Sequence, residues 1–152
     1  MHILSGGQTG VDRAALDAAL HAGVSVAGWC PAGRWAEDGP IPPRYPLRET
    51  QTADPAERTR LNVRDAEAVL ILARGDLAGG TRRTADIARD TGRPLLVLDP
   101  ATADPLTAVD WCRQHGVDRL DVAGPRESEA PGIYSEARSL LVAMLRYIGS
   151  GR

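Results

Sequence analysis

Hydrophobic residues recur in two patterns along this chain of 152 residues, as short continuous runs and at helical spacing. Short apolar runs predict five strands, at about 2–5, 24–29, 68–73, 94–99 and 118–123. Between and after them, apolar residues recur at helical spacing and predict five helices, at about 10–22, 54–65, 81–91, 105–115 and 132–148. Strands and helices therefore alternate throughout the chain.

This alternation predicts an α/β protein, a three-layer parallel sheet with helices on both faces, built from right-handed βαβ units. The run from Ala68 to Ala73 contains no polar position, as is typical of a strand covered on both sides. The length suits a single domain, which we place at residues 1–148, with a frayed C-terminus at 149–152. We expect the strand order 2-1-3-4-5.

Three residues are placed to cap helices. Asp54 and Asp104 each precede a proline, which is favoured at the first helical position. Thr81 follows two glycines and is expected to cap the helix at 81–91. The last helix carries an apolar stripe that predicts core residues: Ala137, Leu140, Leu141, Met144, Leu145 and Ile148.

Two glycine-rich turns follow the first and third predicted strands. Gly6, Gly7 and Gly10 would let the backbone adopt positive φ and let a ligand reach bare peptide N–H groups. The next helix directs its positive end to the same place, so the turn predicts an anion cradle suited to phosphate; a tight connection without a ligand is the alternative. Gly79 and Gly80 form the second turn. Ligands of such sheets bind at the carboxyl ends of strands, so we expect the turns to face each other.

Polar side chains at the two helix starts extend this candidate site. They are Gln8, Thr9, Asp12 and Arg13 at the first, and Thr81, Arg82, Arg83 and Thr84 at the second. Peptide N–H groups and a guanidinium together bind a phosphate or oxyanion strongly. Neighbouring residues of a helix diverge, so at most one of Arg82 and Arg83 is a ligand. Asp12 suits hydrogen bonding to ligand N–H or O–H groups, or orienting Arg13.

The segment from Cys30 to Leu47 shows neither of these two patterns and has no periodicity. It contains five prolines, two glycines and two aromatic residues. A loop of this length without secondary structure is usually functional or disordered. Its prolines and aromatics favour a lid or wall over the glycine-turn site; a surface insertion is the alternative.

Composition excludes several classes of protein. All 18 basic residues are arginine, which rules out a Walker-type phosphate loop and a Schiff-base lysine. A net charge of −2 provides no field to attract nucleic acid or a membrane surface. We find no run that spans a bilayer and no signal peptide, and we expect a cytoplasmic protein.

Other chemistries lack their key residues. Ser5 occupies the first glycine position of a dinucleotide-binding motif, and no acidic residue follows the second strand. Ser5 is not in a G-x-S-x-G elbow either, which disfavours a triad hydrolase. Cys30 and Cys112 show no metal-ligand spacing and are interpreted as reduced thiols. Cys30 suits a small buried hydrophobe better than a ligand.

Five blocks, in order along nearly the whole chain, resemble the putative molybdenum carrier family: Ser5–Arg13, Gly28–Gly39, Asn62–Val63, Gly79–Thr81 and Val122–Ser128. The resemblance implies a Rossmann-like fold related to the Lonely Guy phosphoribohydrolases and the DNA-processing proteins. It implies binding of molybdenum cofactor (molybdopterin), a phosphorylated pterin, for storage or transfer. It also implies a homo-oligomer, with a molybdoenzyme as an acceptor.

The resemblance carries residue roles with it. Gly6, Gly7, Gln8 and Thr9 would hold one anionic part of the ligand, and Gly79, Gly80 and Thr81 another. Glu37 and Asn62 would be polar wall residues. Arg126 would be an anion ligand at the rim, with a surface arginine as the alternative. Together with Asp12 and Arg13 these residues form the predicted cofactor site; no catalytic or metal-ligating residue is predicted.

One departure from the related enzymes bears on activity. The Lonely Guy enzymes carry a P-G-G-x-G-T-x-x-E pattern with a catalytic glutamate. If Thr81 is aligned with the motif threonine, Thr84 takes the position of the glutamate. Threonine cannot perform carboxylate chemistry, which favours a non-catalytic carrier. The alternative is a nucleotide-phosphate-binding sensor or a phosphoribohydrolase-like enzyme.

Overall fold

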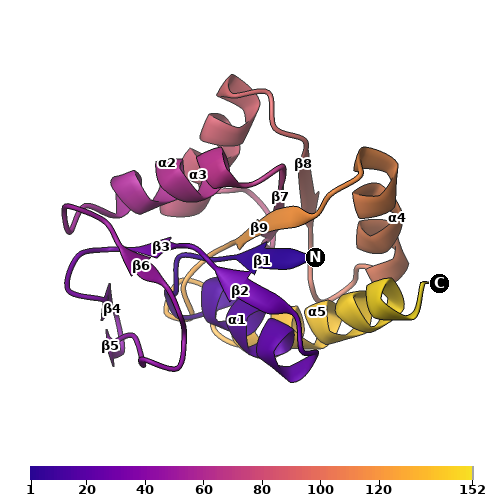
Figure 1. The fold of residues 1–152 in the computed structure, drawn as a ribbon, viewed down its shortest axis with the longest axis horizontal. Helices are drawn as coiled ribbons and strands as arrows, with labels where there is room; N and C mark the ends of the chain where they lie inside the picture. Colours follow the sequence, from indigo (N-terminus) through magenta and orange to yellow (C-terminus); the bar gives the residue numbers. More distant parts are fainter. Residues whose placement is uncertain (152) are drawn as a thin grey trace.

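Five parallel strands form the central sheet of the computed structural model, which describes residues 1–151 (Figure 1). Their order is β2 (Ser25–Ala27), β1 (His2–Leu4), β9 (Arg119–Ala123), β7 (Ala68–Leu72) and β8 (Leu95–Leu98). The α/β class and the parallel sheet are confirmed, but the predicted strand order is wrong, because β9 lies between β1 and β7. The centre suits β9, whose Leu120 and Val122 are fully buried, whereas the edge strand β8 is half-buried.

Helices cover both faces of this sheet, as predicted (Figure 1). One face carries α1 (Val11–His21), α4 (Pro105–His115) and α5 (Ile133–Ser150), and the other carries α2 (Pro55–Asp65) and α3 (Gly79–Asp90). No helix within residues 1–151 is long and apolar enough to cross a membrane. The expected frayed end at 149–152 includes Arg152, which lies outside the described residues.

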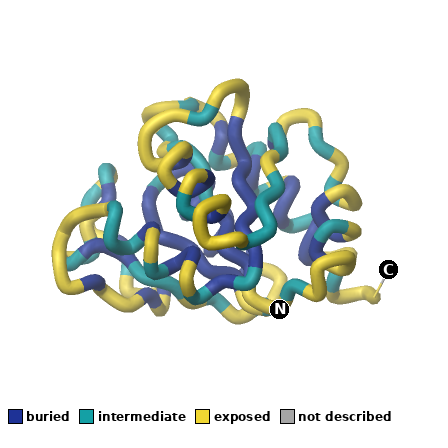
Figure 2. Tube along the Cα trace, turned by 90° about the horizontal axis from the view of Figure 1, so that it is seen from above, coloured by how far each residue is buried: buried dark blue, intermediate teal, exposed yellow. Residues whose placement is uncertain are grey.

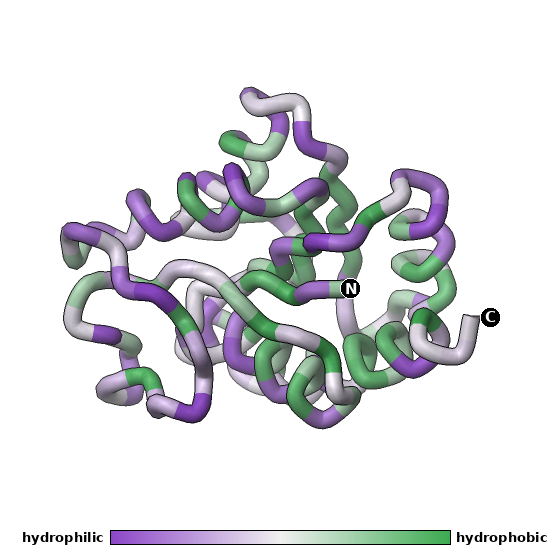
Figure 3. The backbone as a smooth tube through the Cα atoms, in the orientation of Figure 1, coloured by the Kyte–Doolittle hydropathy of each residue, from purple (hydrophilic) through white to green (hydrophobic). Residues whose placement is uncertain are grey.

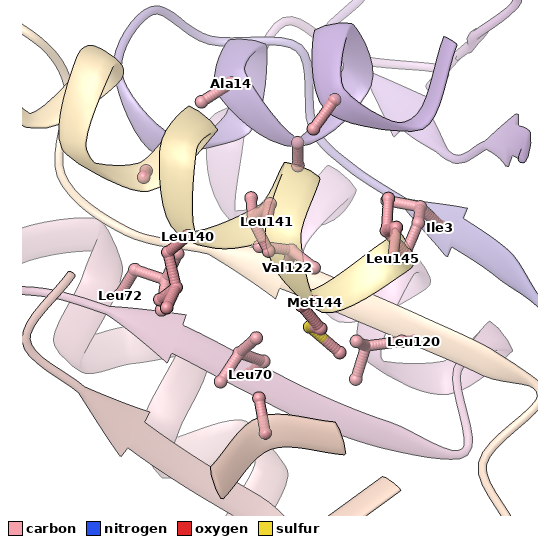
Figure 4. Packing of buried hydrophobic residues seen from close by; sticks show 14 of the residues in the cluster. Ile3, Ala14, Leu70, Leu72, Leu120, Val122, Leu140, Leu141, Met144 and Leu145 are labelled. Atoms are coloured by element: carbon pink, nitrogen blue, oxygen red, sulfur yellow. The ribbon is translucent and has the colours of Figure 1, made fainter. Parts of the chain in front are cut away.

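The larger core lies between the sheet and α5 (Figure 4). Leu70 and Leu72 of β7 and Leu120 and Val122 of β9 face the apolar stripe of that helix (Figure 4). The predicted stripe is confirmed: Ala137, Leu140, Leu141, Met144 and Leu145 are buried and Ile148 is partly buried. Each large apolar side chain buried here contributes about 1.5–3 kcal/mol to stability. Figure 2 shows the buried positions gathered along the central strands, with exposed positions on loops and outer helix surfaces.

The opposite face is held by a smaller cluster that joins α2 and α3 to the sheet. Its buried members are Val63, Val69, Ile71, Ala73, Ala85 and Ala88. The helix α2 is mostly hydrophilic, in contrast to α5 (Figure 3). This thinner apolar layer leaves polar side chains of α2 and α3 beside the ends of the strands.

Residues 30–47, the proline-rich segment, fold into a compact unit beside α1. Two short strand pairs stabilise it: β3 (Trp29–Cys30) with β6 (Arg48–Glu49), and β4 (Trp35–Ala36) with β5 (Gly39–Pro40). The guanidinium of Arg34 donates hydrogen bonds to the carbonyls of Ile41, Pro42, Tyr45 and Leu47 at 2.9–3.1 Å. A buried cluster lies beneath it: Leu16, Cys30, Ala36, Ile41, Tyr45 and Leu47.

The helix starts agree with the sequence at two places and differ at a third. Asp54 and Asp104 accept hydrogen bonds from the backbone N–H groups of Ala56 and Leu106, so both predicted caps are confirmed. The helix α3 begins at Gly79, after an N-cap residue without a side-chain cap. The predicted Thr81 cap is wrong, because the helix already includes Thr81. The start of α3 therefore lacks a side-chain acceptor of its own.

Candidate functional site

A cleft of about 250 Å³ opens at the carboxyl edge of the sheet, between the ends of β1 and β9 and the helices α2 and α3. Eight residues of the predicted cofactor site line it: Gly6, Gln8, Asp12, Asn62, Gly79, Gly80, Thr81 and Arg126. The two glycine turns therefore meet at one site, as expected. The remaining lining residues are Trp35, Pro55, Arg58, Thr59, Arg83, Thr84, Asp121, Ala123, Gly124 and Glu129. Four predicted residues are not among them: Gly7, Thr9, Arg13 and Glu37.

The backbone of the first glycine turn is already hydrogen-bonded within the protein. The N–H of Gly7 donates to Ser5 Oγ at 3.2 Å, and the N–H of Gln8 donates to Asp12 Oδ2 at 3.3 Å. The N–H of Thr9 donates to Gln8 Oε1 at 2.9 Å. The interpretation of this turn as a cradle of bare N–H groups is therefore wrong at these three positions, because side-chain acceptors satisfy them.

Protein neighbours explain why the first turn needs glycine. A Cβ on Gly6 would lie 2.3 Å from Arg58 Nη1, and one on Gly10 would lie 2.3 Å from the carbonyl oxygen of Pro125. Gly7 adopts a φ of 80° and packs against apolar side chains of the proline-rich segment. The glycines of this turn permit close packing of three chain segments, so access for a ligand is not needed to explain them.

Glu37 joins the proline-rich segment to two other loops. Its carboxylate accepts hydrogen bonds from Ser128 Oγ at 2.6 Å, from Ser128 N at 3.2 Å and from the hydroxyl of Thr9. The bonds from Ser128 and Thr9 hold the pKa of Glu37 below its ordinary value. Trp35, from the same segment, lines the cleft. The segment thus forms a wall of the cleft, in agreement with the favoured sequence interpretation. Glu37 holds this wall against the two other loops through its hydrogen bonds.

Arg13 also bonds to the protein. Its Nε and Nη2 donate to the carbonyl of Gly7 at 3.2 and 3.0 Å, and its Nη1 lies 3.0 Å from Asp38 Oδ2. The guanidinium carbon lies 5.6 Å from the ring centre of Tyr45. Arg13 therefore braces the first turn from outside the cleft.

Two residues on one face of α2 reach the first turn and β3. Asn62 accepts a hydrogen bond from Trp29 N at 2.8 Å and donates one to Trp29 O at 3.0 Å, so both ends of its amide hold β3 in place. Arg58, four residues earlier, donates through Nη1 to Gly6 O at 3.0 Å and to Asp12 Oδ2 at 3.3 Å. The spacing places both side chains on the same helix face.

The start of α3 differs from residues 7–9 of the first turn because its peptide N–H groups are free. In the part of the chain that the structure describes, no acceptor pairs with the N–H groups of Gly79, Gly80 or Thr81. Gly79 and Gly80 are exposed, and all three residues line the cleft. Arg83 and Arg126 line the same space. Unpaired N–H groups at a helix N-terminus beside guanidinium groups favour an anion.

Two buried carboxyl groups line the cleft. Asp12, on α1, is 6% exposed, and Asp121, on β9, is 4% exposed. Burial raises the pKa of both, and Arg58 opposes the rise at Asp12. At Asp121 burial and the nearby Asp12 raise the pKa to about 8, so this carboxyl holds a proton at neutral pH. The cleft therefore has unpaired N–H groups at the start of α3 and carboxyl groups along the sheet.

The fold around this cleft is shared with known proteins. The circularly permutated YpsA SLOG family matches residues 3–145. The chain belongs to this family. The crystal structure of a putative molybdenum carrier protein from Syntrophus aciditrophicus SB is 39% identical in sequence, with a TM-score of 0.90, over 95% of this chain and 94% of that chain. The resemblance to molybdenum carrier proteins and the Rossmann-like fold are confirmed. No curated protein matches.

In this member of the SLOG family, sequence reasoning missed several lining residues, including Arg58, Asp121 and Trp35. Arg58 precedes Asn62 by four positions, and that spacing was an available signal once Asn62 had been singled out. Asp121 interrupts a strand that is otherwise apolar between Leu120 and Ala123, and a carboxyl in a strand buried on both faces was a second signal. Trp35 carried no signal beyond its place in the proline-rich segment.

The cysteines of this SLOG protein lie apart from the cleft lining. Cys30 and Cys112 are free and buried, and burial raises the pKa of both thiols, that of Cys112 to about 11. Such thiols behave as small apolar side chains. Among residues 1–151, no three His, Cys, Asp or Glu side chains gather in a way that could hold a metal ion.

Proposed function

We propose that this protein is a non-catalytic carrier that binds molybdenum cofactor or a related molybdenum species. The observation that carries the proposal is the set of unpaired N–H groups of Gly79, Gly80 and Thr81, which open into the cleft. The similar crystal structure, 39% identical, is titled a putative molybdenum carrier protein. A phosphate or oxyanion group of the ligand would bind at this helix start, where the peptide dipoles favour negative charge.

The proposal assigns the predicted residues to two kinds of role. Gly79, Gly80, Thr81 and Arg126 would contact the anionic group, together with Arg83. Gln8 and Asp12 would border the rest of the ligand. Gly6, Gly7, Thr9, Arg13, Glu37 and Asn62 would shape the cleft through the contacts described above. Transfer of the ligand by a homo-oligomer to a molybdoenzyme would complete the carrier role.

Thermal-shift measurements test this proposal directly. The panel contains molybdenum cofactor, molybdate, tungstate, inorganic phosphate and nucleoside monophosphates. A ligand at 100 times its dissociation constant stabilises the folded state by about 2.7 kcal/mol, which raises the melting temperature of a chain this size by roughly 5–10 °C. A rise with the cofactor supports the carrier. Failure of every molybdenum species to shift the melting temperature at high micromolar concentration would refute it.

Two neighbouring arginines provide a matched pair of variants. Arg83 lines the cleft, whereas Arg82 does not, and both are exposed. Arg83→Gln is expected to weaken binding of the anionic ligand about tenfold, because a charge-assisted hydrogen bond contributes about 1.5–3 kcal/mol. Arg82→Gln is expected to leave the affinity unchanged. Equal losses in both variants would indicate a general charge effect and would contradict the assigned site.

The buried carboxyl groups favour a second candidate, a nucleotide-phosphate-binding sensor or phosphoribohydrolase-like enzyme. The hydroxyl of Thr84, at the aligned glutamate position, donates to Gly80 O at 2.9 Å and supplies no acid. Asp121, protonated at neutral pH, would instead protonate a departing base while water adds to the sugar carbon. Release of free base from nucleoside monophosphates, lost in Asp121→Asn, would support this candidate. No release across the panel would reject the enzyme.

A further inference from the structure

Asp121 is a buried carboxyl without a partner inside the protein. It lies in the central strand β9, opposite Leu4 of β1 and Val69 of β7. It is 4% exposed and lines the cleft. No hydrogen bond within residues 1–151 uses its side chain. Its oxygens border the cleft and are not fully enclosed, so a ligand in this cleft can reach them and supply the missing hydrogen bond.

The surroundings of Asp121 restrict the chemistry of that partner. The charged groups that act on it are Asp12 and Arg58, and Arg58 already bonds to Asp12 and to Gly6 O. Because Arg58 is already paired with Asp12, the anionic end of a ligand gains more at the unpaired N–H groups of α3 than beside these residues. A ligand N–H group suits Asp121, because either protonation state of a carboxyl has an oxygen that can accept it.

Trp35 adds a flat apolar surface to the same cleft. It extends from β4 in the proline-rich segment, lines the cleft and is 53% exposed. A planar ring stacked on this indole would gain both burial and favourable geometry. The cleft therefore combines a stacking surface, an N–H acceptor and an anion site on three different elements.

We propose that the cleft recognises the 2-amino-4-oxopyrimidine ring that pterins and guanine share, with the exocyclic amine donating to Asp121 and the ring stacked on Trp35. The amine of this ring lies between a ring N–H donor and a ring nitrogen acceptor, so it matches a carboxylate as well as a carboxylic acid. The phosphate of such a ligand binds at the start of α3, and this part rests on the proposed function. The protein thus selects the organic ring of its ligand and not only the ligand's charge.

Two pairs of ligands that differ at one group test the inference by calorimetry. Guanosine monophosphate is compared with inosine monophosphate, which lacks the 2-amino group. A pterin phosphomonoester is compared with its lumazine counterpart, in which a carbonyl replaces that amine. We expect the amino form of at least one pair to bind tenfold or more tightly, because losing the amine leaves Asp121 unpaired. The pair that shows the preference identifies the source, nucleotide or pterin. Equal affinities within both pairs would overturn the inference.

Variants separate this inference from the proposed function. Asp121→Leu is expected to abolish the preference for the amino form while the affinity for ribose 5-phosphate stays within twofold. If the unmodified protein binds neither ribose 5-phosphate nor the cofactor, the proposed anion site at α3 is wrong. If the unmodified protein binds ribose 5-phosphate but does not prefer the amino form in either ligand pair, only the proposed ring recognition is wrong. If Asp121→Leu does not fold, the two ligand pairs on the unmodified protein still decide.

Fluorescence tests the stacking on Trp35 independently. The chain has three tryptophans, of which only Trp35 lines the cleft. The pterin phosphomonoester is expected to quench the indole emission of the unmodified protein. In Trp35→Phe the quenching disappears while the affinity stays within about threefold, because phenylalanine still stacks. In Trp35→Ala the affinity falls at least tenfold. Unchanged quenching in Trp35→Phe would exclude Trp35 from the contact.

Discussion

The two glycine-rich turns read alike in the sequence but differ in the structure. The first, residues 5–10, is almost entirely buried, and three of its N–H groups are bonded to side chains of the same region. The second, Gly79–Thr81, begins with two exposed glycines, and its N–H groups have no acceptor within residues 1–151. The first turn is a packing junction, and the second is open to a ligand.

The difference shows that glycine has a different role in each turn. At Gly10 the side chain is excluded by the carbonyl of Pro125, whereas at Gly80 an added Cβ would meet nothing within 4 Å. A glycine with no neighbour at a helix start gains nothing for the fold, because glycine is less favourable in a helix than alanine. Residues of the first turn should therefore stabilise the protein, and residues that serve the ligand should cost stability.

The largest effect is expected from Gly10→Ala. Gly10 has φ 76° and ψ −129°, and its new Cβ would lie 2.3 Å from Pro125 O. Backbone strain and overpacking together should lower the free energy of unfolding by about 4 kcal/mol, measured by urea denaturation. Gly23→Ala is the control, because Gly23 has φ 69° with nothing within 4 Å and should lose only about 1 kcal/mol. Similar losses in both would mean that the packing at Pro125 is unimportant.

Arg58→Met should produce the next largest effect. The change removes the bonds to Gly6 O and Asp12 and leaves the Asp12 carboxyl buried without its cation. We expect a loss of about 3 kcal/mol at pH 7. Arg58 lowers the pKa of Asp12, so the loss should shrink at acid pH, where Asp12 is protonated in either protein.

The control for Arg58 lies on the same helix. Arg60 is exposed, and Arg60→Met should change the free energy of unfolding by less than about 0.5 kcal/mol. Comparable losses in the two variants would show that Arg58 contributes through helix stability and not through its contact with the first turn.

Local pattern was enough to predict much of the fold, and long-range pairing was not. The continuous apolar run of β7 and the proline-capped helices α2 and α4 follow from neighbouring residues, and they were placed to within one or two positions. The strand order failed because nothing near β9 in sequence says that it pairs with both β1 and β7. Periodicity describes which face of an element is apolar, but not which partner covers it.

The site shows the same division. Gly79 and Gly80 could be singled out because a helix start is a local feature. The three hydrogen bonds that close the N–H groups of the first turn are local, but its contact with Arg58, which is 52 residues from Gly6, could not be predicted. Asp121 combines the two cases. Its polar side chain within an apolar strand is visible in the sequence, but whether that side chain has a partner depends on the whole fold.

Asp121→Asn should stabilise the protein in a pH-dependent way. In the folded state the pKa of Asp121 is raised to about 8, above its ordinary value, so folding retains a proton that the unfolded chain releases. The contribution of Asp121 to the free energy of unfolding is therefore most favourable at acid pH and becomes less favourable as pH rises toward 8. Asparagine does not titrate, so the gain in the free energy of unfolding should be larger at pH 8.5 than at pH 5, measured by urea denaturation. A gain independent of pH would show that Asp121 ionises normally.

The smallest change in stability, and the sharpest test of the comparison, is expected from Gly80→Ala. Alanine at this helical position should raise the free energy of unfolding by about 0.5–1 kcal/mol, because glycine loses more backbone entropy on folding. The new methyl group would stand where a phosphate approaches the peptide N–H groups, so the affinity for inorganic phosphate or the cofactor should fall at least tenfold. Gly149→Ala is the matched control, an exposed helical glycine of α5 with nothing within 4 Å of an added Cβ and no place in the cleft lining. It should show a stability change of the same sign without any change in ligand affinity. A Gly80→Ala protein that is more stable and still binds as tightly would remove the distinction between the two turns, because Gly80 would then serve neither the fold nor a ligand.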